Sequence, residues 1–379
     1  MHGSLHSRTA PQRVRVWDLP TRVFHWLLVA CVAVALATGF LAPEWWMGVH
    51  IVAGYGLVLL LVFRLIWGVF GSEYARMLSM ARSMRHFGDY LRGLALLRPP
   101  HYVGHNPVGA AMIHALLAVF TALVVTGLIV QAGEEKQGPL AGIASFATGI
   151  AAKELHEWLA FAAIAMIIVH IAGVLVESRL QKTNLVRGMI DGWMRLPEGF
   201  HLPPQRPARP LAAAFTLAAI AAAAAAVLGL LSRLPPHGVP DMPVSATYRA
   251  ECGDCHWAYH PSLLPRASWA GIMNSLGDHF GEDATLGANE AAEIAAYLEH
   301  FAAEAWDTEA ANRLATTSSD APLRITLSPY FVRKHREIQP AVFERTGIRS
   351  RGNCIACHRD ADSGRFDDQA IDIPKGVEP

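Results

Sequence analysis

Residues 156–170 of this 379-residue chain read HEWLAFAAIAMIIVH, a mostly apolar run with a histidine at each end. On one α-helix, His156 and His170 would lie within about 40° of the same face and about 21 Å apart along the axis. Ionisable side chains are costly inside a membrane and usually have a function there. The run therefore predicts a membrane helix that presents two imidazoles, at two depths, on one face.

Five windows, including this one, are apolar and long enough to cross a bilayer, which takes roughly 20 residues. They lie at residues 22–41, 48–70, 107–130, 153–177 and 210–232. Only 17% of the residues are charged, which is low for a soluble protein. No small-residue cleavage site clearly follows the first window, so we expect an uncleaved anchor rather than a signal peptide.

The chain divides into three predicted parts. Residues 1–200 hold four spans, residues 201–243 form a proline-rich linker around the fifth span, and residues 244–379 form a C-terminal domain. The fifth span is mostly alanine and contains no histidine, so we expect a tether that binds no cofactor. The predicted fold class is all-α, with a membrane four-helix bundle, a fifth membrane helix and a small helical domain.

Charge differs between the two ends of the chain, although the formal net charge is zero. Residues 1–240 hold 19 Lys or Arg against 11 Asp or Glu, whereas residues 241–379 hold 13 against 21. The acidic domain argues against nucleic acid as a partner and fits a docking surface for a basic protein. In the membrane part, basic residues gather on alternate sides of the spans. This alternation predicts a cytoplasmic N-terminus and an external C-terminal domain.

Two further histidines match the depths of the first pair. His50, at the outer start of the second span, matches His156, and His25, near the inner end of the first span, matches His170. Any one of them could be an isolated interfacial histidine, but two levels of paired imidazoles are what two stacked b-type haems need. His114, on the third span, has no partner at its depth, and we interpret it as a packing or hydrogen-bonding residue.

The C-terminal domain contains the pattern Cys-x-x-Cys-His twice. The two copies are Cys252, Cys255 and His256, and Cys354, Cys357 and His358. Two thiols at this spacing attach haem covalently, and the following histidine becomes an iron ligand. A zinc site or a thioredoxin-like pair is the rival, but it requires a reducing compartment and leaves the histidine unexplained. We therefore predict two c-type haems.

Each c-type haem needs a sixth ligand or an open position. In small helical cytochromes c this ligand precedes the last helix, which we expect at residues 288–301, and His279 lies there. Met273 competes, but it belongs to a short amphipathic segment and is expected in the core. For the second haem, His335 is the candidate between residue 301 and the second motif, and His260 and His300 are weaker alternatives.

The membrane part resembles a known family. The run VWDLPTRVFHW at residues 16–26, the run GHNPVGA at residues 104–110, and the two histidines of the fourth span are similar to the bacterial cytochrome b-561 family. That family includes the b-type subunits of nickel–iron hydrogenases. The resemblance covers roughly residues 12–200, and it implies His25, His50, His156 and His170 as haem ligands and redox exchange with quinone.

The C-terminal domain resembles the di-haem cytochromes c. The matching residues are the runs ECGDCH at 251–256, LLP at 263–265, SW at 268–269, HFG at 279–281, YL at 297–298 and NCIACH at 353–358. The resemblance implies two axial histidines on each haem, His256 with His279 and His358 with His335. His260 stands where that family has proline, and it could compete with His279.

The predicted function is electron transfer between the quinone pool and a periplasmic redox partner, in the bacterial inner membrane. Quinol would reduce the b haems, and the c haems would pass electrons to an acceptor such as a small c-type haem protein. The alternatives are a quinone-coupled oxidoreductase acting on an oxygen species and the cytochrome subunit of a hydrogenase-like complex. A haem-storing or sensing protein is a third reading, for which four haems are excessive. The sequence offers no catalytic constellation, so we expect an electron carrier.

Several polar residues remain without an assigned role. No set of residues marks a quinone pocket. Arg22, Arg64 and Trp26 lie near haem-level helix ends, where arginine more often snorkels or pairs with haem propionates. His101 and His105 lie in the loop after the second span, and we expect them to be structural. Cys31 is expected to be a small core residue.

Overall fold

The computed structural model describes residues 13–195, 205–315 and 323–374. Within these ranges the chain forms two compact units. The first holds most of the membrane helices. The second holds the C-terminal domain, the turn at residues 43–48, and residues 127–154, where two membrane helices end and begin.

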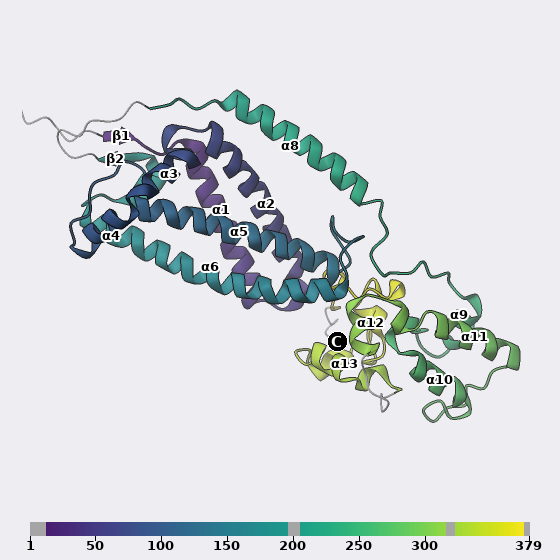
Figure 1. Cartoon of the computed structure of the whole chain (residues 1–379). Helices are drawn as coiled ribbons and strands as arrows, with labels where there is room; N and C mark the ends of the chain where they lie inside the picture. The colour runs from purple at the N-terminus through teal and green to yellow at the C-terminus, as the bar shows by residue number, and fades with distance from the viewer. Residues whose placement is uncertain (1–12, 196–204, 316–322, 375–379) are drawn as a thin grey trace, which may run out of the picture. The chain divides into compact units, whose positions relative to one another are not determined.

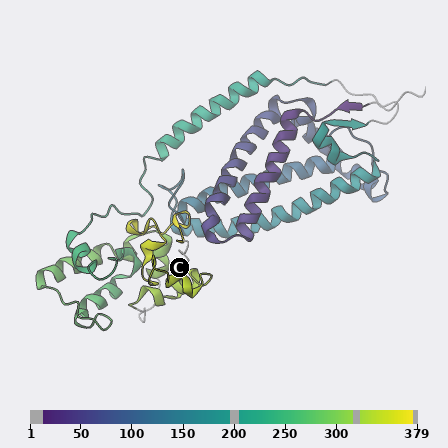
Figure 2. The ribbon, with the colours of Figure 1, turned by 180° about the vertical axis from the view of Figure 1, so that it is seen from behind.

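Four long helices lie side by side as a bundle (Figures 1 and 2). They are α1 (Leu19–Phe40), α2 (Met47–Phe70), α5 (Pro107–Gly133) and α6 (Phe146–Leu180). A fifth long helix is α8 (Pro210–Leu231). All five are long and apolar enough to cross a membrane, which confirms the five predicted spans. Helix α6 extends beyond the predicted window at both ends.

Local sequence explains where the bundle begins. Asp18 caps α1, since its carboxylate accepts a hydrogen bond of 2.8 Å from the backbone N–H of Thr21. Pro20 stands in the first turn, where a missing N–H costs nothing. The short strands β1 (Arg13–Arg15) and β2 (Trp193–Arg195) pair antiparallel and join the two sequence ends of the bundle.

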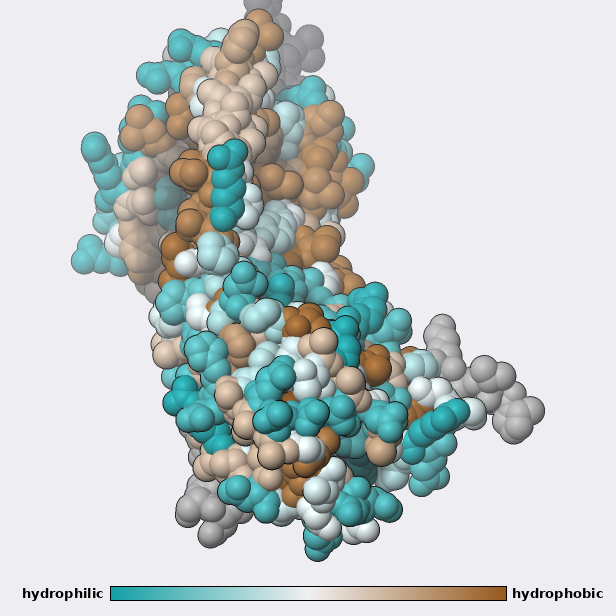
Figure 3. Space-filling view, turned by 90° about the vertical axis from the view of Figure 1, so that its right-hand side faces the viewer, coloured by the Kyte–Doolittle hydropathy of each residue, from teal (hydrophilic) through white to brown (hydrophobic). Residues whose placement is uncertain are grey.

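The interior of the bundle is a narrow apolar seam. Leu61, Phe120 and Ala163 are buried there, from α2, α5 and α6. Most other apolar side chains on these helices are exposed, such as Leu59 at 71%, which is expected of residues that face lipid. Figure 3 shows hydrophobic side chains on the surface of the membrane helices. Helix α8 contacts this unit through Ala213, which packs against Ile66 and Trp67.

Shorter helices complete both units. In the first unit they are α3 (Met77–Ser83), α4 (Phe87–Ala95) and α7 (Leu185–Asp191). In the C-terminal domain they are α9 (Ala246–Cys252), α10 (Arg266–Asn274), α11 (Ala288–His300), α12 (Glu309–Ala315), α13 (Pro329–Lys334) and α14 (Pro340–Phe343). The predicted helix at 288–301 is thus confirmed. Its residues Ile294 and Leu298 are fully buried beside Trp269 of α10.

Candidate haem sites

The first pair of membrane histidines meets inside the bundle, with the ring planes 68° apart. The ring centroids of His50 on α2 and His156 on α6 are 6.2 Å apart. The Nδ1 of His50 donates to the carbonyl of Ala35, at 3.1 Å. A carbonyl only accepts, so Nδ1 carries the proton and Nε2 keeps its lone pair for a metal. The Nδ1 of His156 lies 3.0 Å from the hydroxyl of Thr126, which can hold that ring in the same way.

The second pair lies one level further along the bundle. Helix α6 is continuous from Phe146 to Leu180, so His170 stands about 21 Å along the axis from His156. His25 on α1 is within electrostatic range of His170. Its Nδ1 is buried and has no hydrogen-bond partner among the described residues. A buried polar atom without a partner is uncommon in a native protein and indicates a missing ligand, ion or water.

In the C-terminal domain, His256 and His279 face each other. Their ring centroids are 6.2 Å apart and the ring planes differ by 28°. His256 follows the first cysteine pair, and its Nδ1 donates to the carbonyl of Trp257 at 2.8 Å. His279 lies in a tight turn in which Phe280 and Gly281 both have positive φ. The turn therefore brings His279 to the motif from the segment before α11.

His335 and His358 form the fourth pair, with ring centroids 6.1 Å apart. The Nδ1 of His335 donates to the carbonyl of Phe331 at 2.9 Å, and the two rings stack. Phe366 packs against the other side of the pair, 5.3 Å from His358. Burial lowers the pKa of His358 to about 4, so its imidazole is neutral and able to bind a metal.

These geometries fit haem with two axial histidines. Two imidazoles that bind one metal from opposite sides, through bonds of about 2 Å each, have ring centroids about 6 Å apart. Three of the four pairs have this separation. In the bundle, Gly54 lies one turn from His50 on the same face, and a Cβ added there would meet no atom within 4 Å. This position of α2, next to His50, therefore has room for a bulky group.

The cysteines do not have the lowered pKa of a redox-active thiol pair. Burial raises the pKa of Cys252 to about 11 and that of Cys354 to about 12. Thiols that exchange disulfides need the opposite shift, because the thiolate is the reactive form. Among the described residues, no group of three or more His, Cys, Asp or Glu could hold a bare metal ion.

His260 has another role in this structure. It is 3% exposed and its Nδ1 accepts from the backbone N–H of Ser262 at 3.2 Å, which caps the following 3₁₀ turn. Its ring packs edge-on against Trp306. These contacts favour His279 over His260 as the partner of His256. Met273 packs against the apolar core, as expected.

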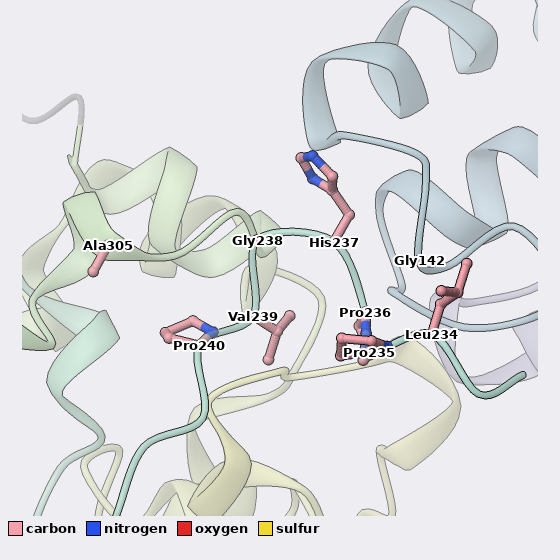
Figure 4. A pocket seen from close by; sticks show the side chains of 9 residues that line it. All are labelled: Gly142, Leu234, Pro235, Pro236, His237, Gly238, Val239, Pro240 and Ala305. Atoms are coloured by element: carbon pink, nitrogen blue, oxygen red, sulfur yellow. The ribbon is translucent and has the colours of Figure 1, made fainter.

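A surface cavity of about 380 Å³ lies elsewhere in the second unit (Figure 4). It is lined by the proline-rich segment 234–240 with Gly142 and Ala305. None of the twelve predicted site residues lines it. His237, which lies on its rim, bonds to Asp307 at 3.2 Å. We assign the cavity no function.

One cluster escaped the sequence analysis. His105, which we expected to be structural, packs at a tilt against Trp17, with ring centroids 4.5 Å apart, and its buried Nδ1 has no partner among the described residues. Arg64 on α2 is only 5% exposed. The sequence does indicate the position of Arg64, because Arg64 follows His50 by the same 14 residues that separate His156 from His170.

Comparison with known proteins identifies both parts of the chain. Residues 16–192 match the family described as prokaryotic cytochrome b561, and residues 248–366 match the dihaem cytochrome c family. The membrane part of the chain thus matches the cytochrome b561 family, and the C-terminal part matches the dihaem cytochrome c family. The chain is therefore a membrane cytochrome of electron transport that uses haem b and haem c, as the sequence predicted.

Similar proteins are known for each part. A probable Ni/Fe-hydrogenase 1 B-type cytochrome subunit of Escherichia coli K12 is 24% identical over 47% of this chain and 89% of its own length. A probable Ni/Fe-hydrogenase B-type cytochrome subunit of Rhodobacter capsulatus is 26% identical over 50% of this chain and 83% of its own length.

Two solved structures are similar to the C-terminal part. The diheme cytochrome c of Rhodobacter sphaeroides is 40% identical and covers 33% of this chain and 98% of its own, with a TM-score of 0.30. The diheme cytochrome c of Shewanella baltica is 33% identical and covers 36% of this chain and 97% of its own, with a TM-score of 0.29.

Proposed function

We propose that this cytochrome carries electrons between the quinone pool and a periplasmic redox protein, through two b haems and two c haems. The observation that carries the proposal is the set of four histidine pairs. Haem iron held by two axial histidines transfers single electrons and leaves no open position for a substrate. A carrier is therefore a better fit than an enzyme that binds oxygen at iron.

The proposed ligands follow the four pairs. The b haems would be held by His50 with His156 and by His25 with His170. The c haems would be held by His256 with His279 and by His358 with His335, and attached through Cys252, Cys255, Cys354 and Cys357. Backbone carbonyls orient three of these rings, at His50, His256 and His335, and so keep their Nε2 atoms free for iron.

The proposed orientation rests on charge. Arginines and lysines gather in the loops next to α3, α4 and α7, and this excess favours the cytoplasmic side. An odd number of spans then puts the C-terminal domain in the periplasm, where bacteria attach c-type haem. In this orientation the His25–His170 haem is the inner one and the His50–His156 haem the outer one.

The charge of the first c-haem lobe indicates what kind of partner would dock there. Residues 251–304 hold nine Asp or Glu and a single basic residue, Arg266. All nine acidic side chains are exposed, and His256 is exposed as well. Electrostatic attraction would steer a basic protein, such as a small c-type haem protein, toward this lobe. We therefore propose electron flow from quinol through the b haems and c haems to such an acceptor.

A second candidate is the cytochrome subunit of a hydrogenase-like complex. The curated relatives named above carry that description, and they match the b part alone. Purification from the native membrane distinguishes the two functions. Stoichiometric co-purification of a nickel–iron enzyme would support the complex, whereas a cytochrome that accepts electrons from quinol by itself would support the carrier.

The direct test is anaerobic reduction by quinol. The full chain is purified in detergent, a reduced quinol is added, and absorption spectra are recorded over time. Reduction of b bands followed by c bands is expected. A His25→Ala variant serves as control, since it should lose reduction by quinol while dithionite still reduces the c haems. If quinol reduces neither haem class in the native protein, electrons enter elsewhere and the proposed direction is wrong.

A further inference from the structure

Arg64 is a buried charge that has no anion within ion-pair distance among the described residues. Its guanidinium donates to the carbonyl of Ala75 at 2.8 Å and approaches the sulfur of Met80 at 3.9 Å. No carboxylate of the described residues lies within 4 Å of it. The nearby Asp18 is already occupied by Thr21, Trp67 and Ser72. Leaving a charge buried and unpaired is strongly unfavourable, so an anion is expected at this place.

His105 supplies a second unsatisfied group in the same region. Its Nδ1 is buried without a partner among the described residues, and the charges of Arg64 and His170 both act on its ring. Burial, with the adjacent charge of Arg64, lowers the pKa of His105 to about 3. The imidazole is therefore neutral and can donate one hydrogen bond. Arg64 and His105 are thus two donors from separate elements, and His105 lies within electrostatic range of one proposed haem ligand, His170.

The spacing along α2 explains why Arg64 stands at this level. The second and fourth spans run in the same direction, and His50 on α2 faces His156 on α6. Arg64 follows His50 by 14 residues, and His170 follows His156 by 14 residues. Both therefore lie about 21 Å further along the bundle.

We infer that Arg64 and His105 bind a propionate carboxylate of the haem held by His25 and His170. This inference rests on the proposed haem at that pair. A guanidinium binds a carboxylate through two parallel hydrogen bonds, and the carboxylate neutralises it. A quinone carbonyl would satisfy a donor but not the charge. A lipid headgroup would have to reach a side chain that is only 5% exposed.

The test compares Arg64→Gln with a matched control, Arg76→Gln. Arg76 lies in the loop that follows α2, and its guanidinium donates to the carbonyls of Gly71 and Pro207. The full chain is purified in detergent, and the midpoint potential of each haem is measured by optical redox titration. The covalent c haems serve as the internal standard for b-haem content.

Removing a positive charge favours ferric haem. Arg64→Gln should therefore change the oxidised-to-reduced ratio of one b haem about tenfold, a fall of about 59 mV, and Arg76→Gln should not.

A second readout reports on the carboxylate itself. Haem labelled with carbon-13 in its propionate carboxyl groups gives redox-difference infrared bands that belong to the propionates. These bands should shift in Arg64→Gln, Arg64→Lys and His105→Gln and stay unchanged in Arg76→Gln. If Arg64→Gln does not fold, Arg64→Lys and His105→Gln carry the test. Unchanged bands in both would overturn the inference.

Two other outcomes have separate meanings. If potentials and propionate bands are unchanged in the Arg64 variants while reduction by quinol slows, the residues bind quinone and the propionate assignment is wrong. If the unmodified protein contains no b haem at the His25–His170 pair, the proposed function has failed before the inference is tested. The b-to-c haem ratio of the unmodified protein separates these cases.

Discussion

The hydroxyl of Thr126 is placed to tune the haem proposed between His50 and His156. It donates to the carbonyl of Ala122 at 2.8 Å and lies 3.0 Å from the Nδ1 of His156, from which it can accept. A hydrogen bond from Nδ1 makes an imidazole a stronger electron donor to its metal and so stabilises the ferric state. The hydrogen-bond partner of Nδ1 therefore influences the reduction potential of the haem.

Replacing Thr126 by valine should raise the potential of one b haem. The lost hydrogen bond is worth about 1 kcal/mol, and the shift in potential should correspond to that energy or less. Thr121→Val is the matched control, because among the described residues the Thr121 hydroxyl bonds to the carbonyl of Leu117 within its own helix and to no histidine. Redox titration of both variants checks the prediction. Equal potentials in the two variants would show that the Thr126 contact does not act on the haem.

His260 makes a prediction about pH. Burial lowers its pKa from 6.5 to about 4. The folded domain therefore favours the neutral imidazole more strongly than the unfolded chain does. Its contribution to stability is complete above pH 6.5 and is lost as the pH falls from 6.5 toward 4. That contribution is roughly 3 kcal/mol at most. Urea unfolding of the full chain at pH 7 and pH 5, followed by the c-haem Soret signal, should show the loss.

The control for this pH dependence is His260→Asn. Asparagine can keep the cap of the turn but does not titrate in this range, so the variant should lose less stability between pH 7 and pH 5. Its c-haem spectrum should be unchanged, since His279 is the proposed ligand. A changed low-spin spectrum in this variant would indicate that His260, and not His279, binds the iron.

At the scale of elements, periodicity and hydropathy predicted the five spans and α11, but they did not predict which helices and loops contact one another. The five spans and α11 follow from apolar runs, which are local properties. Strands β1 and β2 were not predicted, because three-residue strands paired across the whole bundle leave no local signal. For the same reason the sequence placed His105 in a structural role. Its position beside Arg64 depends on how α2 and the start of α5 pack.

The loop between α5 and α6 depends on one buried cation. Lys136 is 2% exposed, and its ammonium lies 2.7 Å from the Oδ2 of Asp307 within the second unit. Methionine has a similar length but no charge, so Lys136→Met should leave Asp307 without this partner. We expect a loss of about 2 kcal/mol, less than for a fully buried pair, because Asp307 keeps the N–H of Phe146 and is partly exposed.

A surface pair provides the comparison for Lys136→Met. Arg336 and Glu337 form an exposed ion pair in the same unit, with their charged atoms 3.8 Å apart. Arg336→Met should therefore cost little stability. Urea unfolding followed by the c-haem Soret signal measures both variants. Similar losses in the two would mean that Lys136 contributes no more than a surface charge.

At the scale of the whole molecule, the basic and acidic excesses lie in different parts of the chain, as do the proposed b and c haems. Basic residues dominate the membrane part, and the acidic excess of the C-terminal domain is concentrated in residues 251–304. The second c-haem lobe does not share this excess, because its arginines and lysines nearly balance its carboxylates. This difference was readable from composition alone, since net charge does not depend on packing. It predicts that a basic partner meets the first lobe.

Charge reversal on the first lobe tests this prediction. Glu282 and Asp283 are exposed next to the turn that carries His279. The double variant Glu282→Lys, Asp283→Lys should slow the oxidation of the reduced c haems by a basic monohaem cytochrome c about tenfold at low salt, because steering by charge typically contributes that much or more. The difference should shrink at high ionic strength, where charges are screened. Glu337→Lys, an exposed change beside the second haem, is the control and should have little effect. If Glu337→Lys slows the reaction as much as the double variant, the partner docks at the second lobe, and the path through the domain ends at the other haem.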